Sequence, residues 1–296
     1  MRIKLVNLGS ALLHPHHASK LHKSDTEIIL LSEIYNKSDQ DVLYSSTIWQ
    51  SYDNCHLILS QGSRAAIALN LDGFTSPPTI LNVPSLPSPL SSWASASALS
   101  FQDGKSLLIL AIYMPQDNTD QSKEVIRALH RYLSFNSNLF SYIAIGGDWN
   151  CVLDPLIDSS RPPRDRCSIS STAEELLSFI NSSSLIDAHR QFNPTLRIST
   201  NIHALNSRRL DRLYVNVPYS TLLRNVQIAK NKWPDTHRIV AFDFSCLLSR
   251  FPRPELGPGF FKLPYEIISD NRFRPMINSA ISNCFQKSRD SQFCQW

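Results

Sequence analysis

Residues 142–150 (Tyr-Ile-Ala-Ile-Gly-Gly-Asp-Trp-Asn) constrain the fold more than any other stretch of the chain. Their first four residues form a short apolar run that predicts a buried strand. Gly146 and Gly147 are expected to break this strand, and without a Cβ they allow close approach of the backbone. Asp148 and Asn150 then stand just beyond the carboxyl end of the strand, where α/β sheets collect ligands and catalytic groups.

Two interpretations of Asp148 and Asn150 stay open at this point. Side chains two residues apart point the same way in extended backbone, so the pair would bring a proton-transfer or metal-binding group and a neutral hydrogen-bonding group into one pocket. The alternative is an Asx turn that ends the strand, which is common for Asp and Asn after Gly. The choice depends on the rest of the chain.

The composition predicts a globular intracellular protein. The chain has 296 residues, of which 42% are hydrophobic and 18% charged, as in ordinary globular domains. No apolar run approaches the roughly 20 residues that span a bilayer, and the N-terminus lacks the apolar segment of a signal peptide. The six cysteines include no Cys-x-x-Cys pair, which argues against a zinc site and a disulfide scaffold. We therefore expect reduced, mostly buried thiols and no membrane partner.

Charge alone does not predict nucleic-acid binding. The net charge is +4, but residues 250–296 hold seven basic and four acidic residues, so the preceding part is nearly neutral. Arginines cluster at residues 161–166 and 208–212, in or near predicted loops. Taken alone, both clusters are interpreted as solvated loops rather than as nucleic-acid contacts.

Strand and helix patterns alternate along the chain. Apolar or alternating runs predict strands at residues 3–6, 27–31, 56–60, 64–70, 107–113, 142–145, 196–200, 210–215, 224–229 and 238–244. Amphipathic helices are expected to begin at the N-cap Asp120 and in the capping box Ser171–Glu174, and a crossover helix between Asn7 and Thr26. Two strand-rich halves with helices predict sheets packed face to face with the helices outside.

Polar groups also stand at or beside the ends of other predicted strands. They are Asn7, Glu33, Tyr113, Asp148, Asn150, Asp211 and His237. A buried Asp such as Asp211 is costly unless it is paired, and a histidine is a natural partner because an Asp–His pair fixes the imidazole tautomer. Alone, His237 is more simply a core or surface histidine, and Glu33 a strand-end charge in water. The joint pattern predicts convergence at one end of the packed sheets and an Asp211–His237 hydrogen bond.

Six short motifs follow one another along the chain. They are Asn7, Leu30-Leu31-Ser32-Glu33, Ile112-Tyr113-Met114-Pro115, Gly146-Gly147-Asp148-Trp149-Asn150, Arg209-Leu210-Asp211-Arg212-Leu213-Tyr214 and Asp235-Thr236-His237. In this order they resemble the endonuclease/exonuclease/phosphatase superfamily. More narrowly, residues 146–155, 185–190 and 209–215 resemble the apurinic-like endonuclease domain of non-LTR (LINE-type) retrotransposon reverse transcriptases. The resemblance spans residues 1–265.

The resemblance implies a fold, an activity and a set of partners. The fold would be a four-layer α/β sandwich of two packed mixed β-sheets flanked by helices, over residues 1–248. Residues 249–296 would be a linker and short helical tail leading to a polymerase domain that is not on this chain. The activity would be Mg²⁺-dependent cleavage of phosphodiester bonds, with Mn²⁺ as an alternative ion. The substrate would be double-stranded DNA, nicked in the nucleus to prime reverse transcription, with a reverse transcriptase domain in full-length relatives.

Carried over by position, the resemblance gives five residues catalytic roles. Tyr113 would contact the scissile phosphate. Asp148 would handle the proton of the attacking water or leaving group, and Asn150 would orient it. Asp211 would pair with His237, which would stabilise the charge developing on the phosphate.

The metal side of the implied site departs from the family pattern. Glu33 would bind the ion through carboxylate oxygen, which hard cations prefer, with Asn7 close by. The last motif is usually Ser-Asp-His in the family, whereas this chain has Asp235-Thr236-His237. Either Thr236 takes the place of an acid, or Asp235 reaches inward as a metal ligand. This departure, together with Ser32 in place of the usual Gln, predicts weakened activity.

Two further functions compete with the nuclease. One is an inactive nucleic-acid-binding remnant of such a domain, which the Asp235-Thr236-His237 triplet favours. The other is a phosphoesterase of the same superfamily that acts on a sugar, inositol or sphingolipid phosphate. The linker and basic tail after residue 249 disfavour this last alternative.

Overall fold

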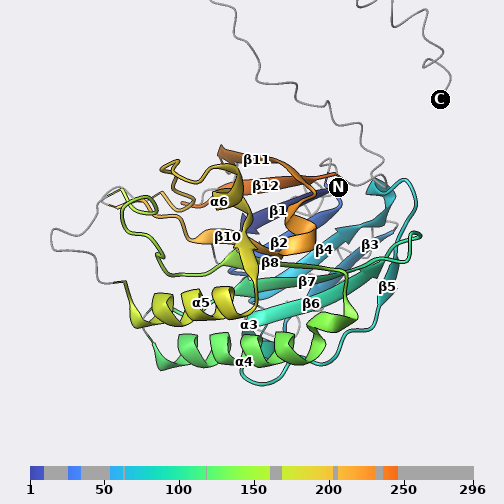
Figure 1. Ribbon diagram of the computed structural model, residues 1–296, viewed down its shortest axis with the longest axis horizontal. Helices are drawn as coiled ribbons and strands as arrows, with labels where there is room; N and C mark the ends of the chain where they lie inside the picture. The colour runs from blue at the N-terminus through green and yellow to red at the C-terminus, as the bar shows by residue number, and fades with distance from the viewer. Residues whose placement is uncertain are drawn as a thin grey trace, which may run out of the picture. The chain divides into compact units, whose positions relative to one another are not determined.

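Two six-stranded sheets form the framework of the residues that the structure describes (Figure 1). In this computed structural model these are residues 1–9, 26–34, 54–62, 64–117, 119–160, 169–202, 206–230 and 236–245. All of them belong to the first of two units, Met1–Phe251 and Pro252–Trp296. The linker and helical tail predicted from residue 249 lie outside the described residues.

The first sheet is mixed, with one parallel pair at its centre. Its strands in spatial order are β11 (Leu223–Lys230), β12 (Arg238–Phe244), β1 (Arg2–Asn7), β2 (Ile28–Ser32), β4 (Ala65–Asn70) and β3 (Cys55–Leu59). The strands β1 and β2 run parallel, and Asn7 is in register with Ser32. The strands β3 and β4 form the predicted antiparallel hairpin. The parallel pair therefore ends at one edge, where Glu33 follows.

The second sheet repeats this plan. Its strands in order are β5 (Thr79–Leu81), β6 (Ala94–Ser100), β7 (Ser106–Tyr113), β8 (Tyr142–Asp148), β10 (Asp211–Asn216) and β9 (Leu185–Asp187). The central pair β7 and β8 is parallel, with Tyr113 opposite Asp148. On its other side β8 is antiparallel to β10, with Asp211 opposite Asp148. Three of the predicted site residues are thus fixed side by side by strand register.

The core between the two sheets explains why they pack face to face. Apolar side chains from both sheets, among them Leu5, Leu30, Ile109 and Leu213, form one buried cluster. Successive side chains of a strand point to opposite faces of its sheet, so one face of each sheet supplies this inner core and the other face points outward. The prediction of two packed mixed sheets is therefore confirmed.

Helices cover the outer face of the second sheet. The main ones are α4 (Asp120–Asn136) and α5 (Ser171–Ser182), which lie side by side beneath the strands in Figure 1. The apolar residues of α4, such as Val125 and Leu129, are buried against this sheet. The other helices among the described residues are short: α3 (Leu90–Trp93), α6 (Ala188–Phe192), α7 (Val217–Ser220) and the 3₁₀ segments Leu71–Gly73 and Ser137–Leu139.

Both helix starts were predicted one residue too late. The N-cap of α4 is Thr119, whose hydroxyl accepts from the backbone N–H of Ser122, and the N-cap of α5 is Ser170. In each case the residue just before the predicted start also carries a suitable hydroxyl, so the local pattern does not separate them. The crossover helix expected between Asn7 and Thr26 lies largely outside the described residues.

One strand was wrongly predicted, and several elements were missed, among them the short elements β9 and α6. Residues 196–200 do not form a strand, although Asn201 makes isolated bridges to Arg208 and His237. Strand β9 and helix α6 follow each other directly at Asp187, which caps α6 by accepting from His189 and Arg190. Elements this short carry too few residues for a periodic pattern.

The Gly-Gly pair does not break β8, which runs on to Asp148. Both glycines are required by close packing instead. A Cβ on Gly146 would lie within 3 Å of Leu5 and Leu30 of the first sheet. A Cβ on Gly147, where φ is +143°, would lie 1.9 Å from the backbone oxygen of Ile112. The glycines thus bring Asp148 close to its neighbours on both sides.

We expect Gly147→Ala to lower the free energy of unfolding by about 2 kcal/mol, because strain and a backbone clash add together. Urea denaturation measures this change. Gly104→Ala is the control: its φ is +78°, but a Cβ there would meet nothing within 4 Å. Backbone strain alone should cost about 1 kcal/mol at Gly104. Equal losses at the two positions would contradict the clash.

In the part of the chain that the structure describes, no helix combines the length and apolarity needed to cross a membrane. Cys55 and Cys151 are free and buried, as expected for reduced thiols.

Candidate active site

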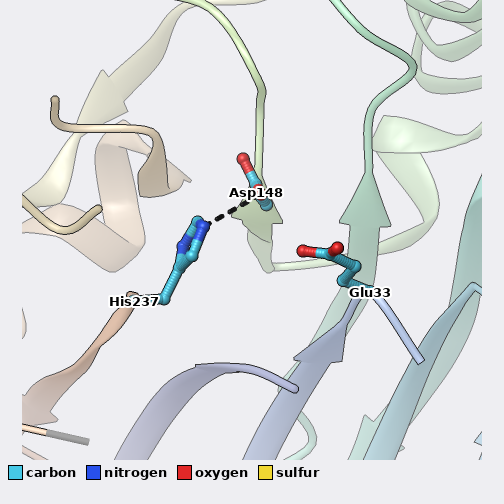
Figure 2. A group of neighbouring side chains, drawn as sticks. All are labelled: Glu33, Asp148 and His237. Atoms are coloured by element: carbon cyan, nitrogen blue, oxygen red, sulfur yellow. Dashed lines mark ion pairs between the residues drawn. The ribbon is translucent and has the colours of Figure 1, made fainter. Parts of the chain in front are cut away.

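Three titratable side chains meet where strands of both sheets end. Glu33 follows β2, Asp148 is the last residue of β8, and His237 directly precedes β12. Each offers one ligand atom, and these three atoms all lie within 4.8 Å of one another. Figure 2 shows the side chains of Glu33 and His237 directed toward Asp148 from either side. The predicted convergence of these three residues is therefore confirmed.

Asp211 and His237 form the predicted hydrogen-bonded pair. Nδ1 of His237 lies 2.9 Å from Oδ2 of Asp211, and both side chains are almost fully buried. Because a carboxylate oxygen accepts this bond, Nδ1 is the nitrogen that carries the proton. The other ring nitrogen, Nε2, lies 3.9 Å from Oδ2 of Asp148. Asp211 thus orients the ring so that Nε2 faces the cluster.

Asp148 is held by hydrogen bonds to both of its oxygens. Nδ2 of Asn7 donates to Oδ2 at 3.0 Å, and the backbone N–H of Asn150 donates to Oδ1 at 2.9 Å. The amide oxygen of Asn7 accepts from the backbone N–H of Gly9 at 2.8 Å. In this structure Asn7 therefore positions Asp148, and its predicted place beside the metal stays a prediction.

Asn150 adopts the Asx turn that the sequence left as an alternative. Its φ is +49°, so the backbone turns at this residue and is not extended. Nδ2 of Asn150 instead donates to the backbone oxygen of Met114 at 2.8 Å. Asn150 therefore ties the end of β8 to the end of β7 and orients Asp148 through its backbone N–H.

Burial and crowded negative charge raise the pKa of Asp148 to about 7. Burial is the larger cause, because it penalises the charged carboxylate, and the nearby charge of Asp211 adds to it. His237 opposes the shift. A cation that binds beside this buried carboxylate would stabilise its charged form.

Tyr113 flanks the same cluster from β7. Its ring stacks on Trp93, with ring centroids 6.1 Å apart. Burial, followed by the charges of Glu33 and Asp148, raises the pKa of its hydroxyl to about 12. Tyr113 therefore keeps its proton and can donate a hydrogen bond to an anionic ligand.

Asn201 is a site residue that the sequence did not reveal. Its Nδ2 lies 2.6 Å from Nε2 of His237. It follows the wrongly predicted strand 196–200, and no motif marks it, so only the tertiary arrangement identifies it.

Thr236 and Asp235 are the two residues between which the sequence left the metal role open. Thr236 is exposed, and its Oγ1 lies 3.5 Å from Nδ2 of Asn201. Asp235 lies outside the described residues, so its predicted role as a metal ligand stays a prediction.

A buried ionic cluster lies beside the site and corrects the interpretation of residues 208–212 as a solvated loop. Arg209 and Arg212 are almost completely buried. Asp158 accepts from Nε of Arg209 at 2.8 Å and lies 3.3 Å from Nη2 of Arg212, and it also pairs with Arg190. Arg209 bonds Asp187 as well, at 2.7 Å. The other arginine cluster, at residues 161–166, lies outside the described residues.

The electrostatics of this cluster favour the charged form of its central acid. Burial alone would raise the pKa of Asp158, but Arg212 and Arg209 outweigh it and hold that pKa well below its usual range. Asp158 also accepts the backbone N–H of Arg209 at 2.8 Å through its own main-chain oxygen. The cluster thus fixes the chain just before Asp211.

The donor set fits a hard divalent cation. Glu33 and Asp148 offer carboxylate oxygens, which suit Mg²⁺ and Mn²⁺, whereas an imidazole nitrogen is a poorer ligand for these ions. His237 is also engaged with Asp211 and Asn201. The two carboxylates are therefore the residues that would hold a metal ion.

Comparison with known proteins gives a match in fold. No family model and no curated protein sequence matches the chain. The 3′-5′ exonuclease NExo from Neisseria meningitidis superposes with a TM-score of 0.64 at 18% identity, covering 83% of this chain and 100% of that one. An AP endonuclease from Archaeoglobus fulgidus gives a TM-score of 0.64 at 16% identity, with 83% and 100% covered. The endonuclease domain of TRAS1, a telomere-specific non-LTR retrotransposon, gives 0.59 at 13% identity, with 83% and 99% covered.

These solved structures superpose on most of this chain, at identities that establish a shared fold rather than a shared activity. The resemblance that the motifs predicted is thereby confirmed at the level of structure. The chain has the fold of the endonuclease/exonuclease/phosphatase superfamily.

Proposed function

We propose that the chain is a divalent-metal-dependent endonuclease that hydrolyses phosphodiester bonds in double-stranded DNA. The observation that carries the proposal is the convergence of Glu33, Asp148 and His237, with Asp211 behind the histidine. Two carboxylates beside an oriented imidazole provide a metal site, a proton acceptor and a donor in one place. Solved structures of the same fold support this chemistry, because they include an exonuclease and an AP endonuclease.

Asp148 takes or returns the proton of the reacting oxygen. Its two oxygens are held by Asn7 and by the backbone of Asn150, so its orientation is fixed before substrate arrives. A base must lie within hydrogen-bond reach of the proton it abstracts, which such a fixed carboxylate can satisfy.

His237 stabilises the negative charge that develops on the phosphate. Asp211 holds its Nδ1 proton, so Nε2, which accepts from Nδ2 of Asn201 in this structure, is the nitrogen that would face the substrate and would carry a second proton when it stabilises this charge. Tyr113, which keeps its hydroxyl proton, is placed to donate to another phosphate oxygen. The imidazole of His237 and the hydroxyl of Tyr113 would thus bind the anionic phosphate without adding negative charge to the site.

The metal ion would be held by Glu33 and Asp148, with Asn7 and Asp235 as further candidates. When bound, a divalent ion neutralises charge on the phosphate and on the reacting oxygens. Mg²⁺ is the expected ion and Mn²⁺ the alternative, because both take carboxylate oxygen.

The narrower role is target-DNA nicking that primes reverse transcription in a LINE-type element. The motif phrases at residues 146–155, 185–190 and 209–215 support it, as does the shared fold with the endonuclease domain of TRAS1. This role would place the protein in the nucleus, with a reverse transcriptase domain as its natural partner.

Nicking of supercoiled plasmid tests the proposal. We expect the protein to convert supercoiled to open-circular DNA with Mg²⁺ or Mn²⁺, and not with EDTA. Asp148→Asn, purified in the same way, controls for contaminating nucleases and should be inactive.

Two other outcomes would contradict the nuclease. Plasmid binding without nicking in either metal would indicate an inactive remnant. Hydrolysis of a sugar or inositol phosphate with no action on DNA would indicate a phosphoesterase of different specificity.

A further inference from the structure

Asn201 is held rigidly at the rim of the site by main-chain pairing on both sides. On one side it exchanges two backbone hydrogen bonds with Arg208, at 2.8 and 2.9 Å. On the other side it pairs with His237 in an antiparallel bridge. The bonds of that bridge are made by flanking residues, as in Ile202 N–H to the oxygen of Thr236 at 2.7 Å.

This register brings the side chains of Asn201 and His237 together. Residues that face each other without exchanging backbone bonds have the closest side chains in an antiparallel pair, with Cα atoms about 4.5 Å apart. Facing residues also point to the same side of the pleat. The side chain of Asn201 therefore shares the side on which His237 meets Asp148.

The amide of Asn201 contacts the ring nitrogen that the proposed mechanism reserves for substrate. Its Nδ2 lies 2.6 Å from Nε2 of His237, and Oδ2 of Asp148 lies 3.9 Å from the same nitrogen. Since Asp211 occupies Nδ1, the amide and Nε2 are adjacent groups on the His237 side of the cluster. Figure 2 shows Glu33 on the other side of Asp148 from His237.

The amide has a second N–H donor available. An amide nitrogen carries two N–H groups, and only one is needed for His237. The other reaches Oγ1 of Thr236 at 3.5 Å, which is beyond the usual range of a good hydrogen bond. An anionic oxygen near Nε2 would be a stronger acceptor for this donor than the Thr236 hydroxyl.

We propose that Asn201 is a substrate contact of this site and donates to a non-bridging oxygen of the scissile phosphate, beside His237. The proposal rests on the proposed nuclease function. Asn201 adds a neutral donor where three carboxylates and an imidazole already crowd together, so it holds the phosphate without changing the charge of the site. It also gives the half-exposed rim of the site a phosphate contact that does not depend on metal.

The test compares Asn201→Ala with the wild type. The substrate is an intact oligonucleotide duplex whose sequence contains one position at which the wild type nicks the plasmid. A donor to bound phosphate is already engaged before the chemical step, so its loss should act on KM. We expect kcat/KM to fall about 10- to 100-fold, mainly through KM, because a hydrogen bond to a charged group is lost. Asn225→Ala is the matched control, because its amide bonds Asp243 near the far end of β12.

A phosphorothioate at the mapped position separates substrate contact from a structural role. In the wild type, sulfur at the oxygen bound by Asn201 should slow nicking in Mg²⁺ and in Mn²⁺ alike, whereas a sulfur that faces the metal should be rescued by Mn²⁺. In Asn201→Ala the first effect should disappear. If the alanine variant does not fold, Asn201→Asp keeps the shape and should lose activity by repelling the phosphate.

Each failure has its own signature. An Asn201→Ala enzyme with kcat/KM within twofold of the wild type overturns the contact and leaves the nuclease intact. An unchanged sulfur effect also overturns it, since Asn201 would then act only by packing. Wild-type protein that nicks no DNA overturns the proposed function and, with it, this contact.

Discussion

Replacing Glu33 with glutamine should slow metal-dependent nicking roughly a thousandfold, because a metal ion is worth several kcal/mol of charge stabilisation and each 1.4 kcal/mol is tenfold in rate. Glu33 supplies one of the two carboxylates in the group whose ligand atoms lie within 4.8 Å of one another. Glutamine keeps the shape of the side chain but offers a neutral oxygen, a weaker ligand for a hard cation.

The measurement is the rate of supercoiled plasmid loss across a range of Mg²⁺ concentrations. The matched control is Glu175→Gln, which makes the same change at an ion pair with Arg127 on the helical face. This control should nick at the wild-type rate. A Glu33→Gln protein that keeps more than about a tenth of the wild-type rate at saturating metal, against the thousandfold loss that charge stabilisation predicts, would remove Glu33 from the metal site.

Asp158→Ala should be strongly destabilising, lowering the free energy of unfolding by about 3–5 kcal/mol. Asp158 is the carboxylate to which Arg190, Arg209 and Arg212 are all paired. Arg209 would keep Asp187, but Arg212 would remain fully buried without an acidic partner in the cluster. An unpaired buried charge costs far more than an intact buried pair contributes.

Urea denaturation of Asp158→Ala measures this loss directly. Asp103→Ala serves as the control, since Asp103 forms a half-exposed pair with Lys105 at 3.8 Å. Such a pair contributes about 0–1 kcal/mol, so its removal should be nearly silent. A loss below about 1.5 kcal/mol for Asp158→Ala would show that water or rearranged side chains satisfy Arg212, unlike a typical buried pair.

The sequence predicted those parts of the fold in which the pattern is long enough to be periodic. The helix at 120–136 and the strands at 107–113 and 238–244 have core faces set by their own residues. The motifs also placed Glu33, Asp148, Asp211 and His237 in one site, because each stands at a strand end. Strand register then does the rest, and register follows from these same apolar faces.

What the sequence did not predict depends on contacts between distant segments. Arg209 and Arg212 look like a solvated pair until Asp158, some fifty residues earlier, is seen to neutralise them. Gly146 looks like a strand break until the first sheet is packed against it. Asn201 belongs to no regular strand, and only its bridge to His237 brings it to the site.

Each sheet supplies two of the four side chains that form the centre of the candidate site. Glu33 and His237 are attached to strands of the first sheet, and Asp148 and Asp211 to strands of the second. A slip of one sheet over the other by a single residue, about 3.3 Å, would part Asp211 from His237 while every strand pairing survived. The proposed activity would therefore depend on the alignment of the two sheets and not only on each sheet being folded. A mutation in the core between the sheets could then abolish nicking without unfolding the protein.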